Sequence, residues 1–215
     1  MNSEFFKRFL SSIFLIPTCF FFIIKGSVFF NIFIFICLLI CIYEWQMMSK
    51  QKIYNIFGYL FLFFSFYCIH NVRNDNENFG LNIFLFILII CISTDLGGYI
   101  FGKVFKGPKL TIISPNKTFS GVFGSYFLSI LVIYFAIIYS DLFSNILSDI
   151  KINVFALAII ISTISQIGDI SISFFKRLSK IKDTGKLIPG HGGILDRVDG
   201  MIFAYPFYYI FKLLL

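Results

Sequence analysis

Two aspartates near the carboxyl end of the chain have a spacing that suits metal chemistry. Asp196 and Asp199 stand three residues apart with Arg197 between them, so on a helix both carboxylates face the same side. Such a pair suits Mg2+, which takes oxygen ligands, keeps several waters and commonly bridges one or two carboxylates to the phosphates of a nucleotide. The alternative is a solvated helix start, where the helix dipole favours aspartate. The pair alone leaves both interpretations open.

A third aspartate lies inside an apolar segment. Asp169 falls within residues 153–175, where an ionisable side chain costs roughly 2.5–3.5 kcal/mol unless it faces a polar cavity or a partner. Polar residues recur around it at helical spacing, namely Ser162, Ser165, Gln166, Asp169, Ser173 and Lys176. We interpret this stripe as one wall of a wet cleft that ends at the cytoplasmic surface.

A fourth aspartate, Asp95, lies in another apolar segment and is followed by Gly98 and Gly102. Glycines at this small-x-x-x-small spacing let helices approach closely, and helix packing is the favoured interpretation for both of them. For Asp95, a role in the site and a hydrogen bond between helices remain equally open.

Glycine and basic residues surround the carboxylate pair. Pro189, Gly190, His191, Gly192 and Gly193 form a stretch whose backbone amides can approach an anion, although many such loops are only turns. The nearby cations either bind a triphosphate or attract anionic lipid headgroups; they are Lys176, Arg177, Lys182 and Lys186. No Walker A sequence is present, which disfavours a nucleotide site of the soluble type.

The elements that must position these residues are membrane helices. With 58% hydrophobic and 13% charged residues, the chain has too few polar groups to cover a water-soluble globule. We predict an all-α, polytopic transmembrane bundle of about seven spans, with six to eight as the range. The predicted spans are 9–24, 27–43, 53–69, 79–101, 121–139, 153–175 and 201–215.

Most of the 18 lysines and arginines fall in loops on one side of this bundle, which predicts a cytoplasmic N-terminus. Residues 102–120 and 176–200 then form long cytoplasmic loops, where we expect function to lie. We divide the chain into a lead-in of about three spans, 1–75, and a catalytic region, 76–215.

A continuous motif begins at Ser173 and reads S-x-x-K-R, then K-D-x-G, then P-x-H-G-G-x-x-D-R-x-D up to Asp199. It resembles the signature of the phosphatidate cytidylyltransferase (CDP-diacylglycerol synthase) family. Supporting pieces lie upstream in the right order: Glu44-Trp45, Asp95, ISPNKT at 113–118 and Gly168-Asp169. The chain departs from the family pattern at Leu96, Asn116, Ser120 and Gly200, and it is short for the family.

The resemblance implies a membrane enzyme, often a homodimer, in the bacterial cytoplasmic (inner) membrane with its active site facing the cytoplasm. It implies transfer of CMP from CTP to phosphatidate, with the bilayer as its setting and no nucleic-acid partner. Mg2+, with a second cation as an option, is expected on Asp169, Asp196 and Asp199. The remaining catalytic residues implied are Lys176, Arg177, Lys182 and Asp183. Substrate binding is expected at Asp95, Ser114, Lys117, Thr118, His191, Gly192, Gly193 and Arg197.

Three other functions match parts of this sequence. Asp196, Asp199 and Gly200 also open the D-x-x-D-G motif of CDP-alcohol phosphotransferases, but the rest of that motif fails because no acidic residue follows Gly200. A CTP-dependent lipid kinase is a second enzyme alternative. An ion-coupled transporter would line its route with Asp95 and Asp169, but the polar residues cluster at one face of the membrane.

Overall fold

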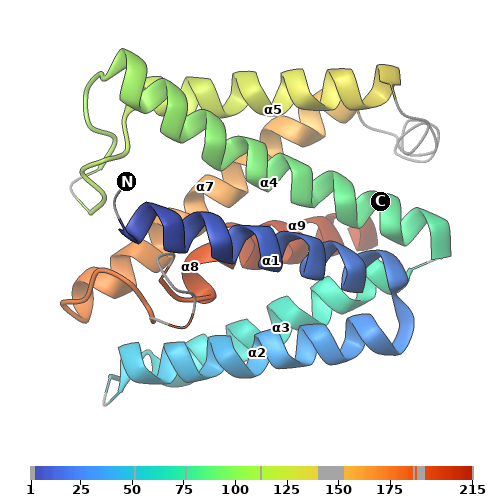
Figure 1. Cartoon of the computed structure of the whole chain (residues 1–215), viewed down its shortest axis with the longest axis horizontal. Coiled ribbons are helices and arrows are strands. Elements are labelled where there is room, and N and C mark those ends of the chain that lie inside the picture. The colour runs from blue at the N-terminus through green and yellow to red at the C-terminus, as the bar shows by residue number, and fades with distance from the viewer. Residues whose placement is uncertain are drawn as a thin grey trace.

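Helices make up the regular structure of the chain wherever the structure describes it. The computed structural model describes residues 3–50, 52–75, 77–111, 113–139, 153–185, 187 and 192–214, leaving out the side chains of 3–12, 77 and 78. Figure 1 shows the helices, which in chain order are α1 (Ser3–Lys25), α2 (Ser27–Ser49), α3 (Asn55–Asn74), α4 (Glu77–Phe105), α5 (Phe119–Tyr139), α7 (Val154–Leu178), α8 (Leu195–Val198) and α9 (Met201–Leu214).

Five of these helices are long and apolar enough to cross a membrane: α2, α3, α4 over Phe79–Phe105, α5 and α7. Two shorter apolar helices, Ile13–Lys25 within α1 and Met201–Leu214, fall where the first and last spans were predicted. The prediction of an all-helical, polytopic membrane protein is therefore confirmed.

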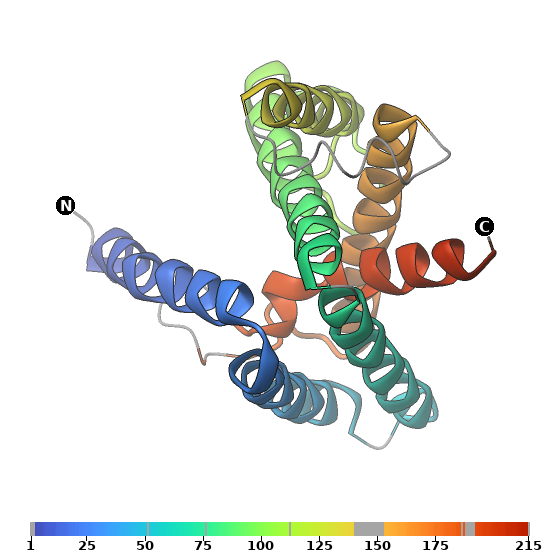
Figure 2. The same cartoon turned by 90° about the vertical axis from the view of Figure 1, so that its right-hand side faces the viewer.

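Helix α4 runs through the middle of the molecule, as the two perpendicular views show (Figures 1 and 2). It packs along α5 on one side, while α2 and α3 pair on the other. Helix α9 lies against both α3 and α7, and the short α8 touches α2. This arrangement brings the two predicted cytoplasmic loops, one after α4 and one after α7, to the same end of the bundle.

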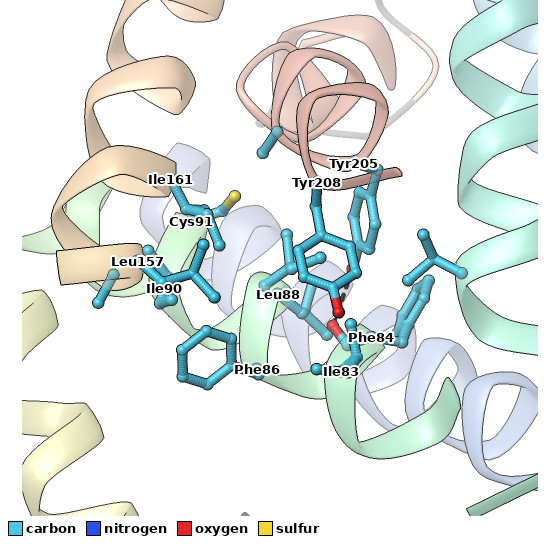
Figure 3. Packing of buried hydrophobic residues seen from close by; sticks show 14 of the residues in the cluster. Ile83, Phe84, Phe86, Leu88, Ile90, Cys91, Leu157, Ile161, Tyr205 and Tyr208 are labelled. Atoms are coloured by element: carbon cyan, nitrogen blue, oxygen red, sulfur yellow. Dashed lines mark hydrogen bonds between the residues drawn. The ribbon is translucent and has the colours of Figure 1, made fainter. Parts of the chain in front are cut away.

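The core gathers apolar side chains where α4, α7 and α9 meet. Figure 3 shows Leu157 and Ile161 of α7 and Tyr205 of α9 pointing toward α4, and all three are at most 1% exposed. The Tyr205 hydroxyl donates to the Phe84 carbonyl at 3.0 Å, which satisfies the one polar atom of that ring. The contact fixes α9, and with it the segment just before α9, against α4.

Glycines bring the backbones of α4 and α5 into direct contact. A Cβ atom added at Gly97 would lie 2.8 Å from the carbonyl carbon of Gly124 and 2.9 Å from Cα of Ser125. No larger residue fits there unless the helices separate. The close crossing sets the position of Asp95, two residues earlier, relative to the start of α5.

Large apolar side chains cover much of the outside of the bundle. Phe57, Phe123 and Leu214, for example, are 70%, 73% and 81% exposed. In water this would be a liability, but a membrane-spanning helix needs such a surface toward lipid.

Candidate active site

A polar cavity of about 410 Å³ opens where α4, α5, α7 and α8 converge. Helix α4 contributes Asp95, α7 contributes Asp169 and Lys176, and the segment around α8 contributes Asp196 and Asp199. The loop before α5 and its first turn supply much of the opposite wall. Its lining includes Thr94, Asp95, Gly98, Tyr99, Ser114, Asn116, Lys117, Thr118, Ser125, Gln166, Asp169, Lys176, Asp183, Asp196, Arg197 and Asp199.

Asp199 is the most deeply buried of the acidic residues in this cavity. It is 7% exposed and lies outside the spanning helices, between α8 and α9. Its Oδ1 accepts a hydrogen bond from the Gly200 amide at 2.9 Å. Burial, followed by the negative charges of Asp169 and Asp95, raises the pKa of Asp199 well above its ordinary value. Three carboxylates from three segments thus line one cavity, where positive charge would stabilise them.

Asp196 faces a different set of partners. Its Oδ1 accepts from Lys176 Nζ at 2.8 Å, and its Oδ2 accepts from the amides of Thr184 at 2.8 Å and Gly193 at 3.2 Å. Burial alone would raise the pKa of Asp196, but these hydrogen bonds outweigh it and lower the pKa below its ordinary value. In this structure Asp196 therefore ties the loop before α8 to the end of α7.

A cation from the loop before α5 faces the acidic side of the cavity. Lys117 Nζ lies 2.5 Å from Asp169 Oδ2. The loop that carries Lys117 doubles back on itself, because the Leu110 amide donates to the Lys117 carbonyl at 2.8 Å and Lys109 forms an isolated bridge with Thr118. This small hairpin brings the lysine into the cavity.

The predicted polar stripe of α7 divides into two halves. Ser162 and Ser165 are almost fully buried, and Ser162 Oγ accepts from Thr94 Oγ1 at 2.8 Å, so this half of the stripe packs against α4. In the other half, Gln166, Asp169 and Lys176 line the cavity. Ser173 is buried and does not line it, but its hydroxyl donates to Asp169 Oδ1 at 3.4 Å. The part of α7 that lines the cavity is therefore shorter than the predicted polar stripe.

The cavity gathers most of the residues singled out from sequence. Those that line it are Asp95, Ser114, Lys117, Thr118, Asp169, Lys176, Asp183, Asp196, Arg197 and Asp199. Gly192, with φ of 87°, and Gly193 lie against Asp196 at its edge. The predicted residue His191 lies outside the described residues, as do Lys186, Pro189 and Gly190.

Two predicted catalytic cations lie outside this lining. Lys182 is exposed. Arg177 borders a second, shallow depression of about 510 Å³ beside Phe174 and Leu178. Its guanidinium donates to the carbonyls of Ile113 at 3.4 Å and Ile181 at 3.1 Å, so it links the two loops around the site.

One residue close to the site was not assigned a role from sequence. Glu44 of α2 is 1% exposed and accepts hydrogen bonds from three groups of the 184–195 segment. Its sequence signals were its position at the end of an apolar span and its place, with Trp45, among the pieces that support the family resemblance.

The carboxylates fit a magnesium ion that is shared with a substrate. Among the described residues, no group of three or more His, Cys, Asp or Glu side chains is arranged to hold a metal by itself. Mg2+ is usually held by one or two carboxylates, waters and substrate phosphates and not by an all-protein cage. Asp169 and Asp199 in one cavity, with Lys117 present as a counter-charge, meet that requirement.

Comparisons with known proteins agree with the signature. The family model described as cytidylyltransferase family matches residues 58–215. The chain is 41% identical over 133 residues to a phosphatidate cytidylyltransferase of Staphylococcus epidermidis, covering 61% of this chain and 49% of that protein. It is 34% identical over 176 residues to one of Brucella suis, covering 81% and 62%. The chain thus spans about half to three fifths of the length of these relatives. Since the match runs from α3 through the cavity to the last helix, the chain belongs to the cytidylyltransferase family.

Proposed function

We propose that this chain transfers CMP from CTP to phosphatidate, giving CDP-diacylglycerol and pyrophosphate. The observation that carries the proposal is the cavity itself. One membrane-boundary space combines Asp95, Asp169 and Asp199 with Lys117 and Lys176. Acidic residues to hold a metal and basic residues to offset phosphate charge are the two requirements of nucleotidyl transfer.

In this reaction a phosphate oxygen of phosphatidate forms a bond to the α-phosphorus of CTP, and the bond from that phosphorus to the bridging oxygen breaks. The electron pair leaves with pyrophosphate. A phosphate nucleophile is already anionic, so the site needs no strong general base. The protein's contribution is positioning and charge neutralisation.

The two lysines of the cavity have different roles in this proposal. Lys117 reaches the centre from a hairpin, where it pairs with Asp169 in this structure. A triphosphate would compete for the lysine, because phosphate offers more negative charge than one carboxylate. Lys176 is already paired with Asp196, so its main effect is to hold the loop whose Gly193 amide faces the same carboxylate.

Magnesium belongs to the proposal. Asp169 and Asp199 would hold Mg2+, and Asp196 would join them as predicted once its bonds to Lys176 and the loop rearrange. A bound Mg2+ would supply charge neutralisation to the phosphates. Arg177, Lys182 and Asp183 stay in the proposal as catalytic residues and the glycine stretch as a phosphate-binding loop, although Arg177 and Lys182 lie outside the cavity lining.

Topology and location complete the proposal. We place the N-terminus in the cytoplasm and count seven spans, with α1 and α9 as the two short ones, in the bacterial cytoplasmic membrane. Residues 102–120 and 176–200 would face the cytoplasm, where CTP is found. The meeting of both loops in one cavity supports this. A homodimer remains a prediction of the resemblance.

The test uses purified protein in mixed micelles with phosphatidate, Mg2+ and CTP labelled in the cytosine ring. We expect cytosine label in the lipid extract and pyrophosphate release in equal amounts. A lipid kinase would instead move the γ-phosphate and leave the label in water-soluble CDP. That outcome would refute the proposal.

A further inference from the structure

A buried carboxylate outside the cavity holds the loop that forms one of its walls. Glu44 lies near the end of α2 and is 1% exposed. Its Oε2 accepts from Thr184 Oγ1 at 2.9 Å and from the Leu195 amide at 2.8 Å, while its Oε1 accepts from the Ile194 amide at 2.9 Å. A carboxylate this deeply buried is tolerated because it is paired with several donors.

The loop passes directly over this carboxylate. A Cβ atom added at Gly185 would lie 2.6 Å from Glu44 Oε1, and one added at Gly193 would lie 2.5 Å from Glu44 Oε2. Both positions therefore leave room for the carboxylate only because they are glycine. Close backbone approach, and not turn formation, explains the glycine at each place.

Two carboxylates accept hydrogen bonds from the same loop. Thr184 gives its hydroxyl to Glu44 and its amide to Asp196. Gly193 gives its amide to Asp196, and the next two amides go to Glu44. Asp196 lines the cavity, whereas Glu44 is not among its lining residues. Glu44 therefore acts on the site only through the loop.

The end of α2 is a firm support for this contact. Trp45 donates from Nε1 to the Asn55 carbonyl at 3.0 Å, and its ring packs against Phe175 of α7 with centroids 5.2 Å apart. Helix α2 is thus fixed to α3 and to α7 next to Glu44. The carboxylate has little freedom to follow the loop if the loop moves.

We infer that Glu44 is a positioning residue, which holds Thr184 and residues 193–195 so that Asp196, the Gly193 amide and Asp199 face the cavity. The residue lies before the matched region 58–215, so a helix of the N-terminal part takes part in building the site. That Glu44 supports cytidylyl transfer rests on the proposed function, but its anchoring of the loop does not.

The test compares Glu44→Gln and Glu44→Asp with the parent protein. Glutamine keeps the shape but places an NH2 group where one oxygen now accepts, so at least one amide or hydroxyl loses its partner. We expect the amides of Gly193, Ile194 and Leu195 to lose protection from hydrogen exchange in Glu44→Gln. Turnover should fall on the order of 10- to 100-fold, as for other groups that orient a site from behind, with a smaller change in KM for CTP. Glu44→Asp keeps the charge with a shorter reach and should restore part of both.

Trp45 is the control, because it is the only tryptophan of the chain and the neighbour of Glu44. Its emission should stay the same in Glu44→Gln, which shows that α2 remains packed on α7. Unchanged exchange at 193–195, unchanged turnover, or an emission shift together with loss of protection in α2 and α7 would each overturn the inference. If the parent protein transfers no cytidylyl group but the loop still loses protection, the anchor stands and the proposed function fails.

Discussion

Replacing Gly97 by alanine should damage the site without touching a substrate. The added Cβ would lie 2.8 Å and 2.9 Å from two backbone atoms of α5, which cannot rotate away. The Gly124 carbonyl oxygen would lie closer still, so α4 and α5 must separate by more than about 0.5 Å to reach an ordinary 3.4 Å contact. Overpacking against backbone costs about 3 kcal/mol at the upper end of its range. Alanine is about 1 kcal/mol more favourable than glycine inside a helix, which offsets part of this cost. The net expectation is a loss of about 2 kcal/mol of stability.

The same movement should lower activity, because Asp95 lies on α4 and Lys117 precedes α5. A displacement approaching 1 Å can reduce turnover by on the order of 10- to 100-fold. For stability, Gly98→Ala is the matched control, since a Cβ there would meet only the Ser125 hydroxyl at 3.0 Å and Gly121 O at 3.9 Å. It should stay within about 1 kcal/mol of the parent protein, because the propensity gain offsets the adjustment of one hydroxyl.

Stability can be followed in detergent with a thiol-reactive fluorogenic dye during heating. Cys41, Cys68 and Cys91 are at most 1% exposed, so they react only as the bundle opens. If Gly97→Ala unfolds at the same temperature as Gly98→Ala and keeps full turnover, the close crossing does not position the site and the reasoning is wrong.

Three further perturbations address the cavity and its orientation. Lys117→Ala should raise KM for CTP in a protein that stays folded, since this ammonium group enters the cavity; unchanged CTP kinetics would make it an ordinary surface charge. Lys176→Met should lower the free energy of unfolding by about 3 kcal/mol. This is the lower end of the range for breaking a buried ion pair, because Asp196 keeps its two amide donors. A loss under about 1 kcal/mol in thermal unfolding would contradict this expectation. The thiol of Lys109→Cys should react with an impermeant reagent only after the cells are permeabilised. Labelling of intact cells would contradict the predicted topology.

Local sequence signals were enough to predict that several of these residues would lie near one another. Asp196 and Asp199 were expected on one helical face; Asp196 lies within the single turn of α8, Asp199 directly follows it, and both line one cavity. Asp169 was expected on a polar wall because an ionised group in an apolar helix needs a polar environment, and it lies there. Lys117 was expected to reach the site from its loop, and it does.

The sequence did not indicate which residues far apart in the chain contact one another. Glu44 lies 140 and 151 positions from Thr184 and Leu195, and no periodicity connects them. Likewise, nothing local showed that Ser162 would bond to Thr94 of α4 instead of facing water. The division of the chain at residue 75 stays a prediction, although α2 contributes directly to the support of the loop.

The most direct test of the central claim is lipid-extractable cytosine label measured against Mg2+ concentration for Asp199→Asn. Asparagine keeps the size but removes the charge of the most buried carboxylate in the cavity. Asp75→Asn is the control, because Asp75 pairs with Lys212 well away from this cavity. The account predicts that Asp199→Asn forms almost no product at any Mg2+ concentration while remaining folded, and that Asp75→Asn matches the parent protein. Near-normal rates and metal dependence in Asp199→Asn would contradict the proposed site.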